Sequence, residues 1–334
     1  MKINFKKFFK KMIFILLVLI FIIFAYFFLG KAPEPEKIIW GADFSQKHSY
    51  YLGLDWKENY LALLDDLGVK HLKIAAHWDF IEPEPNEYYF DDLDWQINMA
   101  EERGAKILLV MGMKTPRWPE CHLPYWAHDL PKEKQQESIL KMLEAIVLRY
   151  KDSQTIEMWQ IENEPFFPFG ECPWTDAEFL DKEIALVKSL DPSKRPVIIS
   201  DSGEGSFWFS VAKRADLVGT TMYKIIWIHQ LEAYFTYPFP PVFYSRKAKI
   251  IETLFGKEVI CVELQAEPWA PKLLYDSPLE EQGKTMNLEQ FRKNIDFAKR
   301  SGLHTFYLWG SEWWYWMKEK HDRPEIWEEA KKLF

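Results

Sequence analysis

From residue 38 onward, the sequence predicts a single (β/α)8 barrel. Strand-like and helix-like patterns alternate eight times over about 300 residues, which is the count of a closed barrel rather than of an open sheet. Several strand-like runs, such as 107–110, are apolar throughout, as expected for parallel strands buried on both faces. The 334 residues, 48% of them hydrophobic, suffice for one large core but not for two barrels. The predicted strands are 38–44, 70–76, 106–111, 155–161, 196–200, 217–222, 258–263 and 305–309.

Helical patterns fill the gaps between these strands. Thr175 and Glu178 fit a capping box that opens the fourth helix. Gly68, Gly104 and Gly302 each stand at a predicted helix end, just before the next strand. The third helix carries one apolar stripe at helical spacing, formed by Ile139, Met142, Leu143, Ile146, Val147 and Tyr150.

A membrane anchor is predicted to precede the barrel. Five lysines in the basic tail 1–11 are followed by an uninterrupted run of eighteen apolar residues at 12–29. This run reaches the short end of what spans a bilayer, and the basic tail is expected to stay cytoplasmic. A cleaved signal peptide is the alternative, but the run is long for one and no small-residue cleavage site follows it. We therefore predict a transmembrane helix at 12–29, a Pro/Glu linker at 30–37 and an extracytoplasmic domain at 38–334.

Composition restricts the partners of this domain. The net charge of -8 argues against a nucleic-acid partner, because phosphate binding needs a basic face. The eight histidines show no metal-ligand spacing, so neither a metal nor a cofactor is predicted. Tryptophan stacks on sugar rings, so sixteen tryptophans favour a carbohydrate ligand, although about half of those in loops are expected to pack loop cores. Those in or near predicted strand-to-helix loops are Trp118, Trp126, Trp174, Trp208, Trp269, Trp313, Trp314 and Trp316.

Two glutamates end predicted strands on opposite sides of the barrel mouth. Glu164 follows strand four and Glu263 ends strand seven, so their side chains can flank one bound glycosidic bond. Retaining hydrolysis needs two carboxyl groups about 5–5.5 Å apart. A salt-bridged loop glutamate is the alternative for Glu164. Glu267 competes with Glu263, which we favour because it ends the apolar run, where barrel catalysts sit.

The surroundings of these glutamates resemble a known family. The motif Trp-x-x-x-Asn-Glu-Pro after strand four, a glutamate ending strand seven and a tryptophan ending strand eight are similar to clan A of the glycoside hydrolases, which includes many cellulases, mannanases and β-galactosidases. The resemblance covers essentially the whole barrel. It implies a retaining β-glycosidase with Glu164 as general acid/base and Asn163 as the donor to the sugar 2-hydroxyl. It also implies that Glu263 is the nucleophile, that Tyr223 steadies it and that Trp309 floors the subsite of cleavage.

The sequence departs from the clan on strand two. The clan usually carries an arginine there, near the nucleophile, whereas this chain has Lys73, which keeps the charge but loses the planar fork. His77 and Trp78 end the same strand and are predicted to line the site, with a structural, hydrogen-bonded histidine as the alternative for His77. The stretch 78–94 and the segment 263–265 resemble β-galactosidase-like members, which favours β-galactosides slightly.

Two loop features have more than one interpretation. Cys121 and Cys172 fall after strands three and four, which are neighbours in a barrel, so they either form a disulfide in an exported protein or remain free thiols. The aromatic segment 225–244, after strand six, is a lid, a bilayer-contacting patch or a self-packed loop.

Two rival functions use the same residues. A non-catalytic carbohydrate-binding barrel is the main alternative; the two carboxylates speak against it, and Lys73 in place of arginine keeps it open. A transglycosylase would differ only in whether sugar or water attacks the intermediate. The particular sugar does not follow from the sequence, because barrel loops set it.

Overall fold

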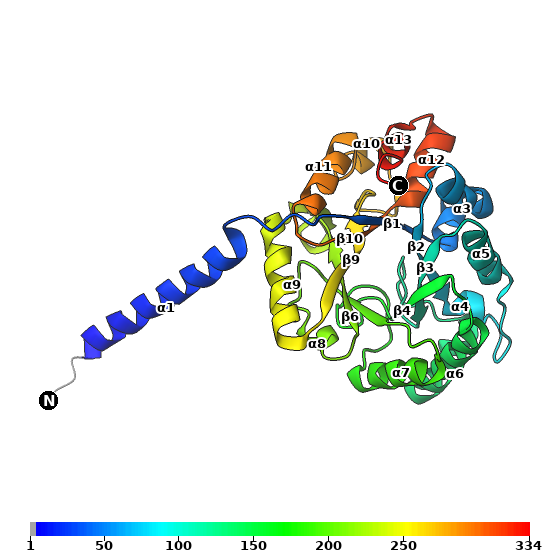
Figure 1. Cartoon of the computed structure of the whole chain (residues 1–334), viewed down its shortest axis with the longest axis horizontal. Helices are drawn as coiled ribbons and strands as arrows, with labels where there is room; N and C mark the ends of the chain where they lie inside the picture. The colour runs from blue at the N-terminus through cyan, green and yellow to red at the C-terminus, as the bar shows by residue number, and fades with distance from the viewer. Residues whose placement is uncertain (1–4) are drawn as a thin grey trace.

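Eight parallel strands close into a barrel in the order β1-β10-β9-β6-β5-β4-β3-β2, with helices around it (Figure 1). The computed structural model describes residues 5–334, so the first four residues of the predicted basic tail, Lys2 among them, lie outside the described residues. The predicted (β/α)8 fold is confirmed. The barrel strands are β1 (Ile39–Phe44), β2 (His71–His77), β3 (Lys106–Gly112), β4 (Ile156–Ile161), β5 (Val197–Asp201), β6 (Leu217–Met222), β9 (Glu258–Gln265) and β10 (Thr305–Trp309).

All eight predicted strands are present. The largest difference in their bounds is at β9, which continues two residues beyond Glu263. Because parallel strands side by side keep their carboxyl ends at one edge, all the strand ends meet at one mouth. Side chains fill the interior below this mouth, so the barrel is a packed core and not a pore; these are Leu108, Ile198, Ile260, Val262 and Tyr307.

Helices of very different length follow the strands. The predicted apolar stripe of α6 is buried throughout. The predicted cap of α7 is wrong by one residue, because Asp176 and not Thr175 accepts from the backbone N–H groups of Glu178 and Phe179. The helices around the barrel are α2 (Gln46–Tyr51), α3 (Trp56–Asp65), α4 (Trp78–Ile81), α5 (Asp91–Glu102), α6 (Lys132–Tyr150), α7 (Ala177–Leu190), α8 (Phe209–Ala212), α9 (Pro241–Phe255), α10 (Leu279–Gln282), α11 (Leu288–Lys299), α12 (Ser311–His321) and α13 (Glu325–Ala330), with short 3-10 turns at Tyr125–Ala127, His229–Leu231 and Leu274–Asp276.

The aromatic segment 225–244 is ordered as a hairpin followed by a helix. Strands β7 (Ile225–Ile228) and β8 (Ala233–Thr236) pair antiparallel, outside the barrel sheet. Helix α9 then begins at Pro241, a residue whose fixed φ suits the first helical position. Because β6 ends just before the hairpin, the hairpin stands at the mouth of the barrel.

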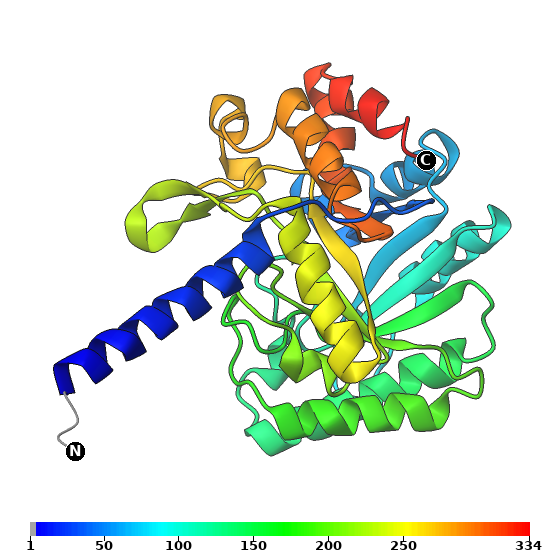
Figure 2. The ribbon, with the colours of Figure 1, turned by 60° about the vertical axis from the view of Figure 1, so that its left-hand side comes forward.

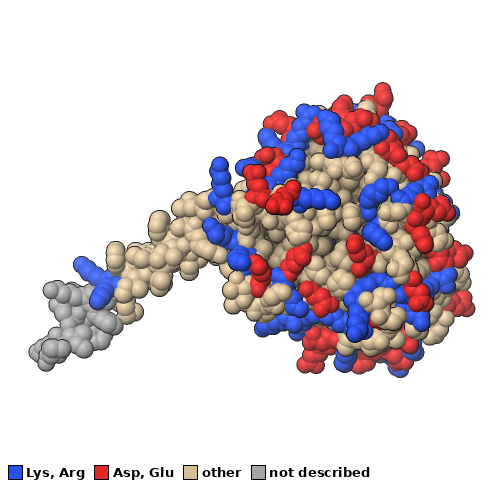
Figure 3. Space-filling view, in the orientation of Figure 1, with Lys and Arg blue, Asp and Glu red and all other residues tan. Residues whose placement is uncertain are grey.

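A long apolar helix, α1 (Phe5–Phe28), precedes the barrel and points away from it (Figures 1 and 2). Its segment Phe9–Phe28 has a mean hydropathy of 2.8 and is not buried in the barrel. Twenty residues at a rise of about 1.5 Å span about 30 Å, the thickness of a bilayer core. Most of α1 carries no charged side chains, whereas the visible face of the barrel mixes both signs (Figure 3). By length and composition, α1 is able to cross a membrane.

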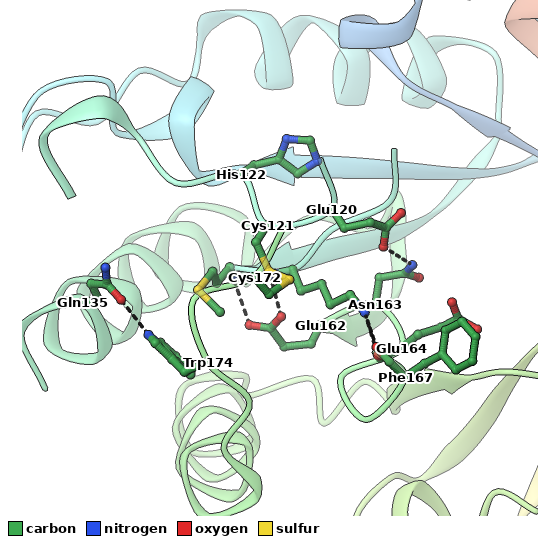
Figure 4. Close-up of a disulfide and its surroundings, with 12 residues drawn as sticks. Glu120, Cys121, His122, Gln135, Glu162, Asn163, Glu164, Phe167, Cys172 and Trp174 are labelled. Carbon is green, nitrogen blue, oxygen red and sulfur yellow. Dashed lines mark hydrogen bonds between the residues drawn. A yellow bond between two sulfur atoms is a disulfide. The ribbon is translucent and has the colours of Figure 1, made fainter. Parts of the chain in front are cut away.

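Cys121 and Cys172 form a disulfide, so of the two interpretations the paired one holds in the structure. The bond joins the loop after β3 to the loop after β4, next to the segment that carries Asn163 and Glu164 (Figure 4). Cys261 is buried and unpaired.

We expect the double substitution C121S/C172S to lower the free energy of unfolding. The bond closes a loop between residues 51 apart, and the loss of this constraint on the unfolded chain is worth about 4 kcal/mol in the chain-entropy model. Urea unfolding of the full chain in detergent measures the difference. Dithiothreitol should shift the wild-type midpoint down and leave the variant unmoved; equal midpoints for the oxidised wild type and the variant would contradict the prediction.

Candidate active site

Glu263 is buried at the mouth of the barrel between two donors. The Lys73 Nζ donates to its Oε1 over 2.9 Å, and the Tyr223 hydroxyl donates to its Oε2 over 3.0 Å. These residues come from β9, β2 and the position just after β6, so the fold brings together three side chains that the sequence predicted to be neighbours. Each oxygen of the Glu263 carboxyl thus has its own donor, which fixes the orientation of the group.

Lys73 lies between two carboxyl groups. Its Nζ is 3.6 Å from Asp43 Oδ2, on the neighbouring strand β1, as well as in contact with Glu263. Burial works against the charge of Lys73, but the negative charges of Asp43 and Glu263 outweigh it and raise the pKa of Lys73. Lys73 therefore supplies the positive charge expected from an arginine at this place. The sequence interpretation missed Asp43, which lies next to the last residue of β1.

Glu164 occupies a constrained backbone position just past β4. Its φ is +44° and that of Glu162 is +58°, in the left-handed region that costs a non-glycine residue about 1–2 kcal/mol. The Glu164 N–H donates to Ser200 Oγ over 2.9 Å, and Lys114 Nζ donates to the Glu164 carbonyl over 2.9 Å. These contacts offset the cost and fix the direction in which the Glu164 carboxyl leaves the strand.

The Glu164 carboxyl is in an environment that opposes its ionisation. Burial raises its pKa well above the ordinary value of 4.5, and the negative charges of Glu263 and then Glu120 raise it further. Glu263 is thus paired with the Lys73 cation, whereas the surroundings of Glu164 favour its protonated form.

Glu120 is a third acidic side chain at the site, and the sequence interpretation missed it. It lies in the loop after β3, and its Oε2 accepts from Asn163 Nδ2 over 3.2 Å (Figure 4). The Asn163 Oδ1 accepts from Gln160 Nε2 and from Ser200 Oγ, each over 3.1 Å. The amide of Asn163 is therefore held on both sides. The only signal in the sequence was an acidic residue in a strand-end loop, which is too common to single out Glu120.

We expect E120Q to reduce the loss of stability at alkaline pH. Burial raises the pKa of Glu120 from 4.5 to about 8. A carboxyl whose pKa is raised by folding binds its proton more tightly when folded, so its contribution to stability declines as pH rises from 4.5 toward 8. Glutamine cannot ionise and still accepts from Asn163. Thermal unfolding of wild type and E120Q at pH 5 and pH 9 (chosen to bracket this window) measures the effect, with the exposed Glu84→Gln as control. If thermal stability declines equally between pH 5 and pH 9 in wild type and E120Q, the prediction is contradicted.

Trp309 ends β10 at the mouth, as predicted, but one of its faces is covered. The Arg117 guanidinium lies 3.9 Å from the centre of the indole ring. Arg117 is itself held by Glu267 and by Glu312, whose Oε2 is 2.8 Å from Arg117 Nη2. The Lys73 Nζ also lies over the indole, 5.7 Å from the ring centre, and Trp309 is partly buried. Glu267, the rival of Glu263, is thus a partner of Arg117.

His77 and Trp78 are both buried. The Nδ1 of His77 is 2.7 Å from Thr115 Oγ1 and its ring lies against that of His122, whereas its Nε2 has no hydrogen-bond partner among the described residues. Trp78 is fully buried and donates through Nε1 to Glu82, so it has no free face for a sugar. The turn into α4 (Trp78–Ile81) directs Trp78 back toward the core, and the sequence alone did not reveal this turn.

Glu162 points toward the disulfide, whereas Glu164 lies on the opposite side of the segment (Figure 4). The Glu162 carboxylate accepts from the backbone N–H of Met113 and of Lys114, over 2.8 and 2.6 Å. Below the disulfide, Glu162 lines a cavity of about 240 Å³ together with Glu183 of α7. Glu162 therefore holds the loop after β3 through its backbone.

Aromatic side chains lead from the rim toward Tyr223. Trp269 packs edge-on against Tyr223 at 5.2 Å between ring centres, and Phe169 links Trp269 to the partly exposed Trp118. Several other tryptophans of the predicted rim are instead buried in the core, namely Trp208, Trp313 and Trp314. Among residues 5–334, no three His, Cys, Asp or Glu side chains are grouped to hold a metal ion.

The sequence matches no protein-family model and no curated protein. Solved structures do match its fold. Xylanase 10B from Thermotoga maritima is 14% identical, with a TM-score of 0.55 over 89% of this chain and 95% of that one. The endo-β-1,4-mannanase from Thermotoga petrophila is 17% identical, with a TM-score of 0.55 over 82% and 68%. A β-galactosidase from the haloarchaeon Halorubrum lacusprofundi is 15% identical, with a TM-score of 0.56 over 81% and 52%.

These identities are low, so the likeness concerns the fold. The chain shares the (β/α)8 barrel fold with these glycosidases, so the resemblance predicted from the sequence is confirmed for the fold. This chain spans about half of the β-galactosidase and nearly all of the xylanase.

Proposed function

We propose that this protein is a retaining glycoside hydrolase that cleaves β-glycosidic bonds with Glu263 as nucleophile and Glu164 as general acid/base. The observation that carries the proposal is the different surroundings of two carboxyl groups at the barrel mouth. Glu263 accepts hydrogen bonds from Lys73 and Tyr223, whereas burial and the negative charge of Glu263 raise the pKa of Glu164 well above its ordinary value. A carboxyl group whose pKa is raised in this way is suited to donate a proton.

The proposed reaction has two steps. In the first, the Glu263 carboxylate attacks the anomeric carbon while Glu164 gives its proton to the leaving oxygen, so the glycosidic bond breaks as the glycosyl–enzyme ester forms. The negative charge of Glu263 is then lost, and Glu164, now ionised, accepts a proton from water. In the second step, that water attacks the anomeric carbon and releases the Glu263 carboxylate. No group outside the protein, the sugar and water takes part.

The surrounding side chains have proposed roles in holding the sugar. Asn163 has a second amide N–H, besides the one given to Glu120, for the sugar 2-hydroxyl. Trp309, which ends β10, floors the subsite of cleavage. The aromatic rim of Trp118 and Trp269 offers further stacking positions. The xylanase, mannanase and β-galactosidase likenesses favour a β-linked glycan as substrate.

The proposed location of the barrel is outside the cytoplasm, tethered to the membrane by α1. The apolar length of α1 and the lysines before it favour an anchor with a cytoplasmic N-terminus. The Cys121–Cys172 disulfide supports export, because such bonds persist in oxidising compartments.

A panel of aryl β-glycosides tests the function on the full chain in detergent. Hydrolysis of at least one member, with the β-anomer of the sugar as first product by NMR, supports the proposal. Oligosaccharide binding without any turnover would favour the non-catalytic binding barrel. Transfer of the sugar to an added alcohol in preference to water would favour the transglycosylase.

A further inference from the structure

The last turn of α1 is docked on the barrel. The ring of Phe27 lies 5.7 Å from that of Phe243, and the ring of Phe28 lies 6.1 Å from that of Phe239. Just before them, Tyr26 lies under the Arg246 guanidinium at 5.0 Å. These contacts place the end of α1 against the start of α9, which is the mouth end of that helix.

This docking has a consequence for the height of the barrel above a membrane. The apolar segment Phe9–Phe28 has twenty residues, and its length of about 30 Å is fully used in crossing a bilayer core. Its last residues therefore lie at the level of the lipid headgroups. Since Phe27 and Phe28 are packed on the barrel, the part of the barrel that they contact lies at that level as well.

Aromatic contacts continue from α1 to exposed side chains on both sides of the docking point. On one side, Phe27 contacts Phe207 at 6.2 Å, and Phe207 stacks with Phe209. On the other side, the chain of contacts runs from Phe239 through Tyr237, at 6.0 Å, to Phe235 of the hairpin, at 5.3 Å. The hairpin extends on the side of the barrel from which α1 leaves (Figure 2).

Three exposed members of this group, Phe207, Phe209 and Phe235, together with the exposed Leu231, form what we call the rim patch. Their side chains are, in this order, 57%, 41%, 39% and 68% exposed. Phe207 and Phe209 precede and begin α8, Leu231 is at the hairpin turn and Phe235 is on β8. Large apolar side chains gathered in this way cost free energy in water and favour a partner surface.

We propose that the rim patch inserts into the headgroup–acyl boundary of the membrane that α1 crosses, so that the barrel rests on the bilayer with its mouth-side rim. Aromatic and leucine side chains are the residues that enter this boundary most readily. The patch is continuous with the anchor through the ring contacts given above, which favours lipid over a separate protein as its occupant. This inference rests on the membrane-crossing part of the proposed function and is independent of the catalytic part.

Single cysteines labelled with an environment-sensitive NBD fluorophore test the contact in the full chain. The native cysteines do not interfere, because Cys121 and Cys172 are bonded and Cys261 is fully buried. The variants L231C and F207C report on the rim patch. Tyr89→Cys is the matched control, since Tyr89 is 53% exposed in the loop between α4 and α5, across the barrel from α1 (Figure 1).

In phosphatidylcholine nanodiscs, the labels at 231 and 207 should emit at shorter wavelength than the label at 89 and should be quenched by doxyl-labelled lipid. The label at 89 should be quenched only by aqueous iodide. Labels at 231 and 207 that are open to iodide and untouched by doxyl lipid would overturn the proposal. Labels shielded from both quenchers would also overturn it, in favour of a protein partner.

Alkaline carbonate extraction distinguishes a missing contact between the rim patch and lipid from the case in which α1 does not cross the membrane. A chain that stays with the lipid while its rim labels face water contradicts the rim contact alone. A chain that carbonate releases shows that α1 does not cross the bilayer. Circular dichroism spectra of the labelled variants that match the wild type confirm that each is folded.

Discussion

Replacing Glu263 by alanine is expected to reduce turnover of aryl β-glycosides by at least about 10⁴-fold. Enzymes lose activity on this scale when a nucleophile that acts together with its partner residues is removed. Without this carboxylate, the glycosyl–enzyme ester cannot form and the first step has no attacking group. Steady-state kinetics of the full chain measure the loss.

Azide supplies the decisive control for this variant. In E263A, a small anion enters the space of the lost carboxylate and attacks the sugar directly, which should restore turnover and give a glycosyl azide of inverted configuration. Because Lys73 would lose one of its two carboxylate partners, E263Q and a circular dichroism spectrum establish that the fold survives. Glu267→Ala should yield no such azide product, since Glu267 is a partner of Arg117. If E267A and not E263A gives the glycosyl azide of inverted configuration, Glu267 is the nucleophile and Glu263 is not.

Replacing Glu164 by glutamine is expected to slow substrates with poor leaving groups by about 10²–10⁴-fold, the contribution of a general acid. Substrates with a dinitrophenyl leaving group need no proton in the first step and should lose little in the rate of glycosylation. The contrast between the two leaving groups identifies the missing function as proton donation.

The pH profile provides a second readout for E164Q. Glu164 acts as an acid only while it is protonated, so wild-type kcat/KM should fall as pH rises through its pKa, which burial and the charges of Glu263 and Glu120 raise well above 4.5. Glutamine cannot ionise, so this alkaline limb should be absent in the variant. An unchanged alkaline limb in E164Q would assign it to a different group.

The barrel was predictable because its signals are local and repeated. Apolar runs such as 107–110 mark buried parallel strands, and the eight alternations fix the architecture by counting. Local capping was less predictable, because Thr175 and Asp176 both fit a cap and only the backbone of α7 decides between them. The hairpin at Ile225–Thr236 was not predicted, since its aromatic residues fit a packed loop as well as a strand pair.

The candidate site was predictable only where a strand end defines it. Glu263, Tyr223 and Lys73 could be placed together because one barrel carries all three: Glu263 is near the end of β9, Tyr223 follows β6, and the long side chain of Lys73 reaches Glu263 from within β2. Glu120 and Arg117 come from the loop after β3, whose path depends on contacts with distant residues, and no sequence pattern gave their positions. For the same reason Trp78 was predicted to line the site but turns into the core.

Trapping of the covalent intermediate tests the central claim most directly. A 2-deoxy-2-fluoro glycosyl fluoride of whichever sugar the aryl glycoside panel identifies should inactivate the full chain and leave one sugar bound. Mass spectrometry of the digested protein should find this sugar on the peptide that contains Glu263, and fragmentation should assign it to that residue. A label on Glu267 or Glu164, or hydrolysis of the panel substrate with no trapped sugar and an inverted first product, would contradict the account.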